Sequence, residues 1–154
     1  MIDPPKILQI AAQPTAMIHI TVPMSEIRNV MGPGLQELMA GLRAQGVAPA
    51  GPWLTHHRKT PSDIFDFELS VPVKSPVTPT GRVANGMLPA ATVARTIYHG
   101  PYEGLPAAWQ EFQAWIAAQG RKSAPTLWET YLVDPSSSPD PAAWQTELTR
   151  PLAE

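Results

Sequence analysis

The sequence predicts an α+β fold made of two βαββ repeats with antiparallel strands. Landmarks recur along the chain: Gly46 and Gly120 are 74 positions apart, and Pro52 and Pro125 are 73 apart. Each half holds one stretch with helical apolar spacing between stretches typical of strands. The turn-rich segment 74–81 separates the halves. We therefore expect a single domain over residues 1–154, divided into repeat one at 7–73, a linker at 74–81 and repeat two at 82–152.

Repeat one begins with a predicted extended stretch over residues 7–22. A helix ending at Gly46 follows, with Pro33 expected in its first turn, where a proline costs no hydrogen bond. The apolar positions of this helix are Leu35, Leu38, Met39 and Leu42. The rest of the repeat is predicted as a strand at 53–58, a polar turn at 60–63 and a strand at 64–73.

Repeat two shows the same order. A strand is predicted over 91–99, followed by a helix with Pro106 in its first turn and Gly120 at its end. Apolar residues recur on this helix at the spacing of a face packed on a sheet: Leu105, Trp109, Phe112, Trp115 and Ile116. The remaining expected elements are a strand at 126–133, a Pro/Ser loop at 134–141 and a last strand that closes at residues 149–152.

Composition limits the function classes. Apolar residues make up 44% of the 154 residues and charged residues 16%, which suits a folded globule that buries about two thirds of its unfolded surface. The net charge is −2 and no basic cluster occurs, which argues against a nucleic-acid or membrane partner. Without cysteine, thiolate metal sites and thiol catalysis are excluded. No signal peptide is evident, so we expect a cytoplasmic protein.

Glu129 is the most informative residue of the chain. It interrupts the run 126–133, whose other residues are typical of a buried strand. Side-chain alternation places Glu129 with Leu127 and Tyr131 on one face, and Trp128 on the other. A carboxylate in such a strand must be paired, protonated or directed into a cavity. The alternatives are a cavity role, a strand-edge carboxylate in water, and a pairing with Arg95 or Arg150.

Three segments of the second half together resemble the GyrI-like domain. They are 98–103 (Tyr-His-Gly-Pro-Tyr-Glu), 128–135 (Trp-Glu-Thr-Tyr-Leu-Val-Asp-Pro) and 150–152 (Arg-Pro-Leu). That family includes effector-binding domains of AraC-type and MerR-type multidrug-sensing regulators and freestanding small proteins. The resemblance implies two βαββ halves related by a pseudo-twofold axis, with a ligand cleft between them. It also places Glu129 where drug-sensing members present an acidic residue to cationic aromatic ligands.

The other candidate ligand-binding residues are aromatic or histidine side chains. Trp53, Trp128 and Tyr131 lie on the strands expected beside the seam between the halves, where they can stack on a flat ligand. Tyr102 either faces the cavity or caps the turn before the helix, and His99 has a ligand-side or a structural role. Trp144 is expected either to pack in the core or to stack on a flat ligand. We expect no metal site, because the adjacent His56 and His57 point to opposite faces, and no cofactor.

Three hypotheses for function follow. The first is a freestanding protein that binds amphipathic, cationic aromatic small molecules with Glu129. The second is a hydrolase that opens cyclopropane-bearing alkylating natural products, with Glu129 and Tyr102 or Tyr131 as catalytic residues. The third is a protein-interaction role like that of the gyrase-inhibiting members. The repeats leave no room for a helix-turn-helix module, so we expect no direct DNA binding. The start at Met1 favours a freestanding protein over a cut-out regulator domain, and the oligomeric state is left open.

Overall fold

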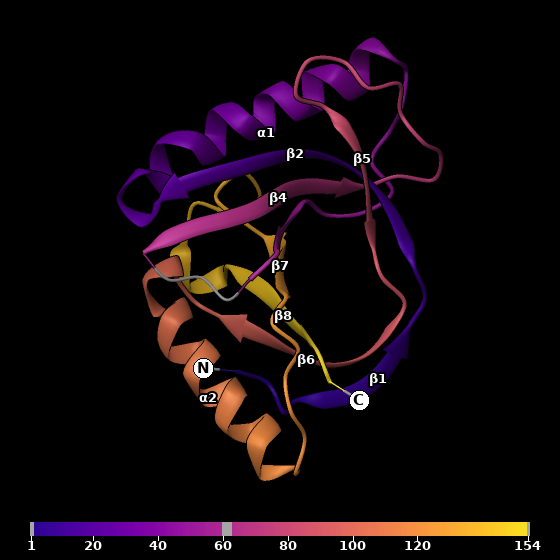
Figure 1. Ribbon diagram of the computed structural model, residues 1–154. Helices are drawn as coiled ribbons and strands as arrows, with labels where there is room; N and C mark the ends of the chain where they lie inside the picture. Colours follow the sequence, from indigo (N-terminus) through magenta and orange to yellow (C-terminus); the bar gives the residue numbers. More distant parts are fainter. Residues whose placement is uncertain (1, 60–62, 154) are drawn as a thin grey trace. The chain divides into compact units, whose positions relative to one another are not determined.

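The computed structural model describes residues 2–59 and 63–153, which form two compact units (Figure 1). The C-terminal unit comprises residues 2–10 and 91–153, and the N-terminal unit comprises the described residues from 11 to 90. The strands and α-helices of the chain are, in order, β1 (Lys6–Ile10), β2 (Gln13–Pro23), α1 (Ile27–Ala44), β3 (Leu54–His57), β4 (Ile64–Pro72), β5 (Ala84–Leu88), β6 (Ala91–His99), α2 (Leu105–Ala118), β7 (Leu127–Val133) and β8 (Gln145–Pro151).

The strand order repeats between the units, which confirms the α+β fold with two βαββ repeats. The N-terminal unit has the order β5-β2-β4-β3, and the C-terminal unit has the order β1-β6-β8-β7. All pairings within these two sheets are antiparallel. In each unit the βαββ repeat supplies three strands and the helix, and one further strand pairs with the first strand of the repeat.

The two further strands divide the chain differently from the repeat boundaries read from the sequence. β1 precedes repeat one but pairs with β6 in repeat two, with Lys6 opposite Arg95. β5 follows the linker but pairs with β2 of repeat one, with Gln13 opposite Leu88. Sequence periodicity carries no information on such long-range pairing, so the predicted stretch 7–22 did not separate β1 from β2.

Each helix covers one face of its own sheet. Figure 1 shows α1 lying along β2. Leu38 and Leu42 of α1 are buried with residues of β2 and β4 such as Ile18 and Phe67. In the C-terminal unit, Phe112 of α2 is fully buried. The other buried residues of that cluster are Ala94, Tyr98, Ala108, Ile116, Leu148 and Leu152. Burial of large apolar side chains, worth about 1.5–3 kcal/mol each, thus fixes each helix on its sheet.

The helix ends agree with the sequence prediction at three of four points. Pro106 occupies the first turn of α2. Gly46 and Gly120 have φ angles of 68° and 72° and end their helices in the left-handed conformation. The prediction for Pro33 was wrong: α1 begins at Ile27, so this proline lies inside the helix. Ile27, Val30 and Met31 have helical spacing and pack against the core, so the N-terminus was misplaced because Pro33 was interpreted as a first-turn residue.

Two further predictions concern a polar turn and the absence of a membrane partner. Residues 60–62 of the polar turn expected at 60–63 lie outside the described residues. Among the helices of the described part, none combines the length and apolar character needed to cross a bilayer.

The interior proline of α1 generates a stability prediction. Pro33 is exposed and removes one helix hydrogen bond, so Pro33→Ala should raise the free energy of unfolding by about 1–3 kcal/mol. Gly32→Ala, at the exposed neighbouring position with open space around it, should gain about 1 kcal/mol or less through helix propensity. Urea unfolding of both variants checks this. A Pro33→Ala protein less stable than wild type would show that the helix requires the proline.

Candidate functional site

Strand register places Glu129 on the face of the sheet that α2 covers. Glu129 is opposite Leu148 of β8, and Leu148 is opposite Thr96 of β6. Leu148 belongs to the core formed with α2, so side chains in this row point toward the helix. Trp128 and Tyr131 pair with Thr149 and Thr146, and lie on opposite faces of β7 as expected.

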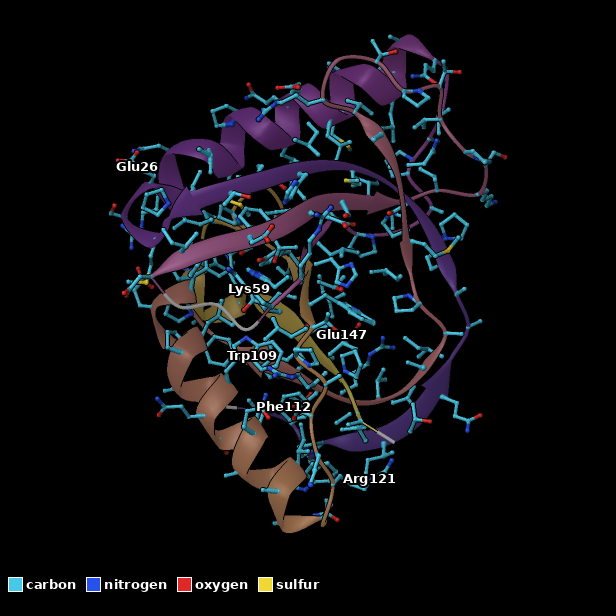
Figure 2. The ribbon with its side chains drawn as sticks, in the orientation of Figure 1. Glu26, Lys59, Trp109, Phe112, Arg121 and Glu147 are labelled. Atoms are coloured by element: carbon cyan, nitrogen blue, oxygen red, sulfur yellow. The ribbon has the colours of Figure 1, made fainter. Side chains whose placement is uncertain are left out.

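Two neutral donors hold the Glu129 carboxylate. The Trp109 indole N–H donates to Oε2 at 2.6 Å, and the Tyr131 hydroxyl donates to Oε1 at 2.8 Å. Trp109 lies on the side of α2 that faces the strands of its unit (Figure 2). Within the described residues neither Arg95 nor Arg150 pairs with this carboxylate. The Nε of Arg95 donates to Thr149, and that of Arg150 donates to the Ala124 carbonyl.

Burial sets the protonation behaviour of this group. Although Glu129 as a residue keeps partial exposure, protein atoms surround its carboxyl group, and this burial raises its pKa above the ordinary value of 4.5. The hydrogen bonds from Trp109 and then Tyr131 act in the opposite direction and lower it. Burial is the largest influence, so ionising this group carries an energetic cost that no positive partner among the described residues offsets.

Aromatic rings extend from this carboxylate. Tyr102 packs edge-on against Tyr131, with ring centroids 5.9 Å apart, and stacks on Trp144 at 5.0 Å. Together with Trp109 they form what we call the Glu129 aromatic cluster: Tyr102, Trp109, Tyr131 and Trp144. Faces of aromatic rings beside a carboxylate are the surroundings that favour an organic cation.

The hydroxyl of Tyr102 is buried and has no hydrogen-bond partner among the described residues. Burial raises the pKa of Tyr102 to about 12, and the negative charges of Asp134 and Glu129 add to this. The hydroxyl therefore stays protonated at neutral pH. It is a buried donor that a ligand or a water molecule would satisfy.

The aromatic cluster includes two residues whose part the sequence did not establish. Trp109 was interpreted as core because it shares the helical spacing of Phe112, although it is only half-buried. Its indole N–H, which a core position cannot leave unpaired, was the available signal. Trp144 had been left between two roles, and it stacks on Tyr102 while its indole N–H donates to the Ser138 carbonyl at 2.9 Å.

Three other predicted ligand-binding residues make their described contacts away from the Glu129 carboxylate. Trp128 is 1% exposed on the opposite face of β7. Trp53 packs against the core of the N-terminal unit. His99 is exposed, and its Nε2 lies 2.9 Å from a carboxylate oxygen of Asp3. Their roles toward a ligand, and the cleft between the halves, stay predictions.

The corresponding strand of repeat one lacks the carboxylate. Leu54 pairs with Ser70 as Trp128 pairs with Thr149, so Thr55 corresponds to Glu129 and His57 to Tyr131. His57 is buried between Phe65 and Phe67, and its Nε2 lies 3.2 Å from the Thr55 hydroxyl. Burial lowers the pKa of His57 to about 4, helped by nearby His56 and opposed by Asp66. Repeat one therefore presents a neutral pair where repeat two presents a carboxylate.

The raised pKa of Glu129 predicts a pH-dependent cost of folding. A carboxyl group with a higher pKa in the folded state stabilises the protein below its unfolded pKa, and this contribution is lost as pH rises through the folded pKa. The stability difference between wild type and Glu129→Gln should therefore shift against wild type as pH rises from about 4.5 toward neutral. Urea unfolding of both proteins across this range measures it. A difference independent of pH would show that the carboxyl group ionises as in water.

Comparisons with known proteins agree with this architecture. Residues 3–153 match the family described as the GyrI-like small molecule binding domain. The crystal structure of the EcmrR C-terminal domain is similar, with a TM-score of 0.86, 21% identity and 98% coverage of both chains. The chain also matches EcmrR in its DNA complex (TM-score 0.84, 22% identity, 98% of this chain), where it spans 57% of the EcmrR chain.

Two more distant structures share the fold. One is described as a hydrolase from Listeria innocua, with a TM-score of 0.68, 15% identity, and coverage of 97% of this chain and 91% of the other. The other is SAV2435 bound to tetraphenylphosphonium, with a TM-score of 0.62, 12% identity, and coverage of 98% and 94%. No curated protein sequence is significantly similar to the chain. On the match over nearly its whole length, the chain belongs to the GyrI-like family of small-molecule-binding domains.

Proposed function

We propose that this GyrI-like protein binds amphipathic, cationic aromatic small molecules at the Glu129 aromatic cluster. The observation that carries the proposal is a buried carboxylate whose partners among the described residues are neutral donors, Trp109 and Tyr131. When ionised, such a group has no positive partner among the described residues, so an organic cation that reaches it gains a strong electrostatic interaction. The description of SAV2435 with tetraphenylphosphonium, an aromatic cation, supports the same ligand class.

The rings of the cluster supply the apolar part of recognition. Tyr102, Tyr131 and Trp144 are in mutual contact and can present ring faces or edges to a flat ligand. Neutral donors also leave the carboxylate free of a fixed counter-ion that a ligand would have to displace. We expect affinity to come mainly from apolar contact and charge selection to come from Glu129.

The charge selection can be measured with paired ligands. Glu129→Gln removes the charge and nearly keeps the shape, so tetraphenylphosphonium should lose about 1–3 kcal/mol of binding free energy, while neutral tetraphenylmethane-like analogues lose little. Calorimetric titration of both ligands provides the measurement. Glu111→Gln removes an equal charge from an exposed position of α2 and should leave both affinities unchanged. Equal losses for both ligands would mean that Glu129 maintains the site and does not select charge.

The same proposal predicts a pH dependence of binding. Only the ionised carboxylate attracts a cation, and burial raises the pKa of Glu129 in the empty protein. Cation affinity should fall as pH is lowered through that pKa, and the bound cation should lower the pKa. Affinity of the Glu129→Gln protein should be nearly independent of pH across this range.

A hydrolase is a second candidate, supported by the buried Tyr102 hydroxyl without a partner among the described residues. Glu129 would accept a proton from a water molecule as its oxygen attacks a ring carbon, the ring C–C bond would break, and a tyrosine hydroxyl would donate a proton to the departing carbon or its conjugated oxygen. The Listeria innocua protein described as a hydrolase shares this fold. Incubation with a cyclopropane-bearing alkylator should then give several ring openings per protein molecule, lost in Glu129→Gln. Retention of one unchanged molecule per protein would decide for binding.

A further inference from the structure

A second hollow lies in the C-terminal unit, on the face of the sheet opposite Glu129. Its volume is about 500 Å³, within the range of small-molecule sites. It is lined by Asp3, Pro4, Lys6, Arg95, Thr96, Ile97 and Glu147. Register places Arg95 on this face, because it pairs with Thr149, which pairs with Trp128 on the side of β7 away from Glu129; Thr96 lines the hollow from the row of Glu129. This hollow shares no residue with the Glu129 aromatic cluster.

The hollow is formed by an arch of the chain that is fixed at both ends. On one side Ile2 bridges Tyr98, and the Asp3 N–H donates to the Ile97 carbonyl at 2.9 Å. On the other side Lys6 pairs with Arg95. Between these points Pro4 and Pro5 have restricted φ angles and no N–H groups. The hollow therefore exists before any ligand arrives.

Two cations face this hollow from neighbouring strands. Lys6 and Arg95 are directly opposite in the β1–β6 register, an arrangement that is unfavourable without a shared anion. The Nε of Arg95 donates to the Thr149 hydroxyl at 3.0 Å and lies 3.4 Å from Glu147. Within the described residues, the terminal nitrogens of Arg95 and the ammonium of Lys6 donate no hydrogen bond. Arg95 is ion-paired with Glu147 through its Nε, while its terminal nitrogens and the Lys6 ammonium keep donor positions for a ligand.

The remaining lining residues limit the charge and shape of an occupant. The carboxylates of Asp3 and Glu147 flank the cations, and the Asp3 carboxylate is held by His99 at 2.9 Å. With two negative groups nearby, a multiply charged anion such as phosphate is disfavoured relative to a singly charged one. Pro4 and Ile97 add apolar walls.

We propose that this hollow binds small organic monocarboxylates that carry an apolar body. The carboxylate lies between the terminal nitrogens of Arg95 and the ammonium of Lys6, where a guanidinium can donate two parallel hydrogen bonds. The apolar body lies against Ile97 and Pro4. The protein thus has an acid-binding site on one face of the sheet, distinct from the proposed cation site on the other.

Benzoate is a suitable probe, with neutral benzamide and inorganic phosphate as comparison ligands. Chemical shifts of the Ile97 methyl groups and the Arg95 side chain should saturate with benzoate and remain unchanged with the other two. Lys6→Gln should weaken benzoate binding about tenfold, and Lys6→Arg should retain it. The Lys6 side chain is exposed and makes no hydrogen bond or ion pair among the described residues, so this substitution leaves the fold intact.

Two further variants serve as controls for the location of the bound benzoate. Lys122→Gln removes an exposed lysine elsewhere in the same unit and should not change benzoate binding. Glu129→Gln should not change it either, which distinguishes the hollow from the proposed cation site. The proposal is overturned if benzoate produces no saturable shift at Ile97, if benzamide binds equally well, or if Lys6→Gln binds benzoate like wild type.

Discussion

The arrangement of the C-terminal unit depends on one constraint, the hydrogen bonding of a carboxylate inside an apolar helix–sheet interface. A charged group there is tolerated when donors satisfy its oxygens. Trp109 from α2 and Tyr131 from β7 supply these donors at 2.6 and 2.8 Å. The helix must therefore sit with Trp109 above β7, and Tyr131 must stand on the same face as Glu129. The Trp109 bond joins α2 to β7, while the Tyr131 bond is made within β7 and orients the carboxylate.

The two repeats show how one framework carries different chemistry. Both helices cover their sheets with apolar residues at matching positions, such as Leu38 and Phe112. On β3, repeat one has Thr55 and His57. At the corresponding positions of β7, repeat two has Glu129 and Tyr131. A neutral pair needs no counter-ion and suits a structural role. At these positions only repeat two carries an acidic residue, Glu129, which the resemblance to drug-sensing members had singled out.

Much of the fold was predictable because local physics determines it. Helical spacing, the glycines at the helix ends and the first-turn Pro106 located both helices, and strand alternation separated Glu129 from Trp128. The pairing of β1 with β6 was not predictable, because it joins residues about ninety positions apart, such as Lys6 and Arg95. Pro33 misled the prediction because a first-turn proline and an interior one differ only in what precedes them.

The candidate site was predicted in part. Glu129, Tyr102 and Tyr131 lie in one cluster. They could be selected beforehand because an unusual carboxylate and nearby tyrosines are visible in the sequence. Trp109 was assigned to the core, because amphipathic spacing describes which face a side chain lies on and not which atom it uses. Contacts between segments distant in sequence, such as Tyr102 with Trp144, arise from tertiary packing that no local pattern encodes.

The most direct test of the central claim is the pKa of the Glu129 carboxyl group itself, followed by carbon NMR in wild type, Trp109→Phe and Tyr131→Phe. The structure predicts a pKa above 4.5 in wild type and a further increase in each variant, because each removes a donor that stabilises the ionised form. A wild-type pKa at or below 4.5, unchanged in both variants, would contradict the account of a buried carboxylate held by these two donors.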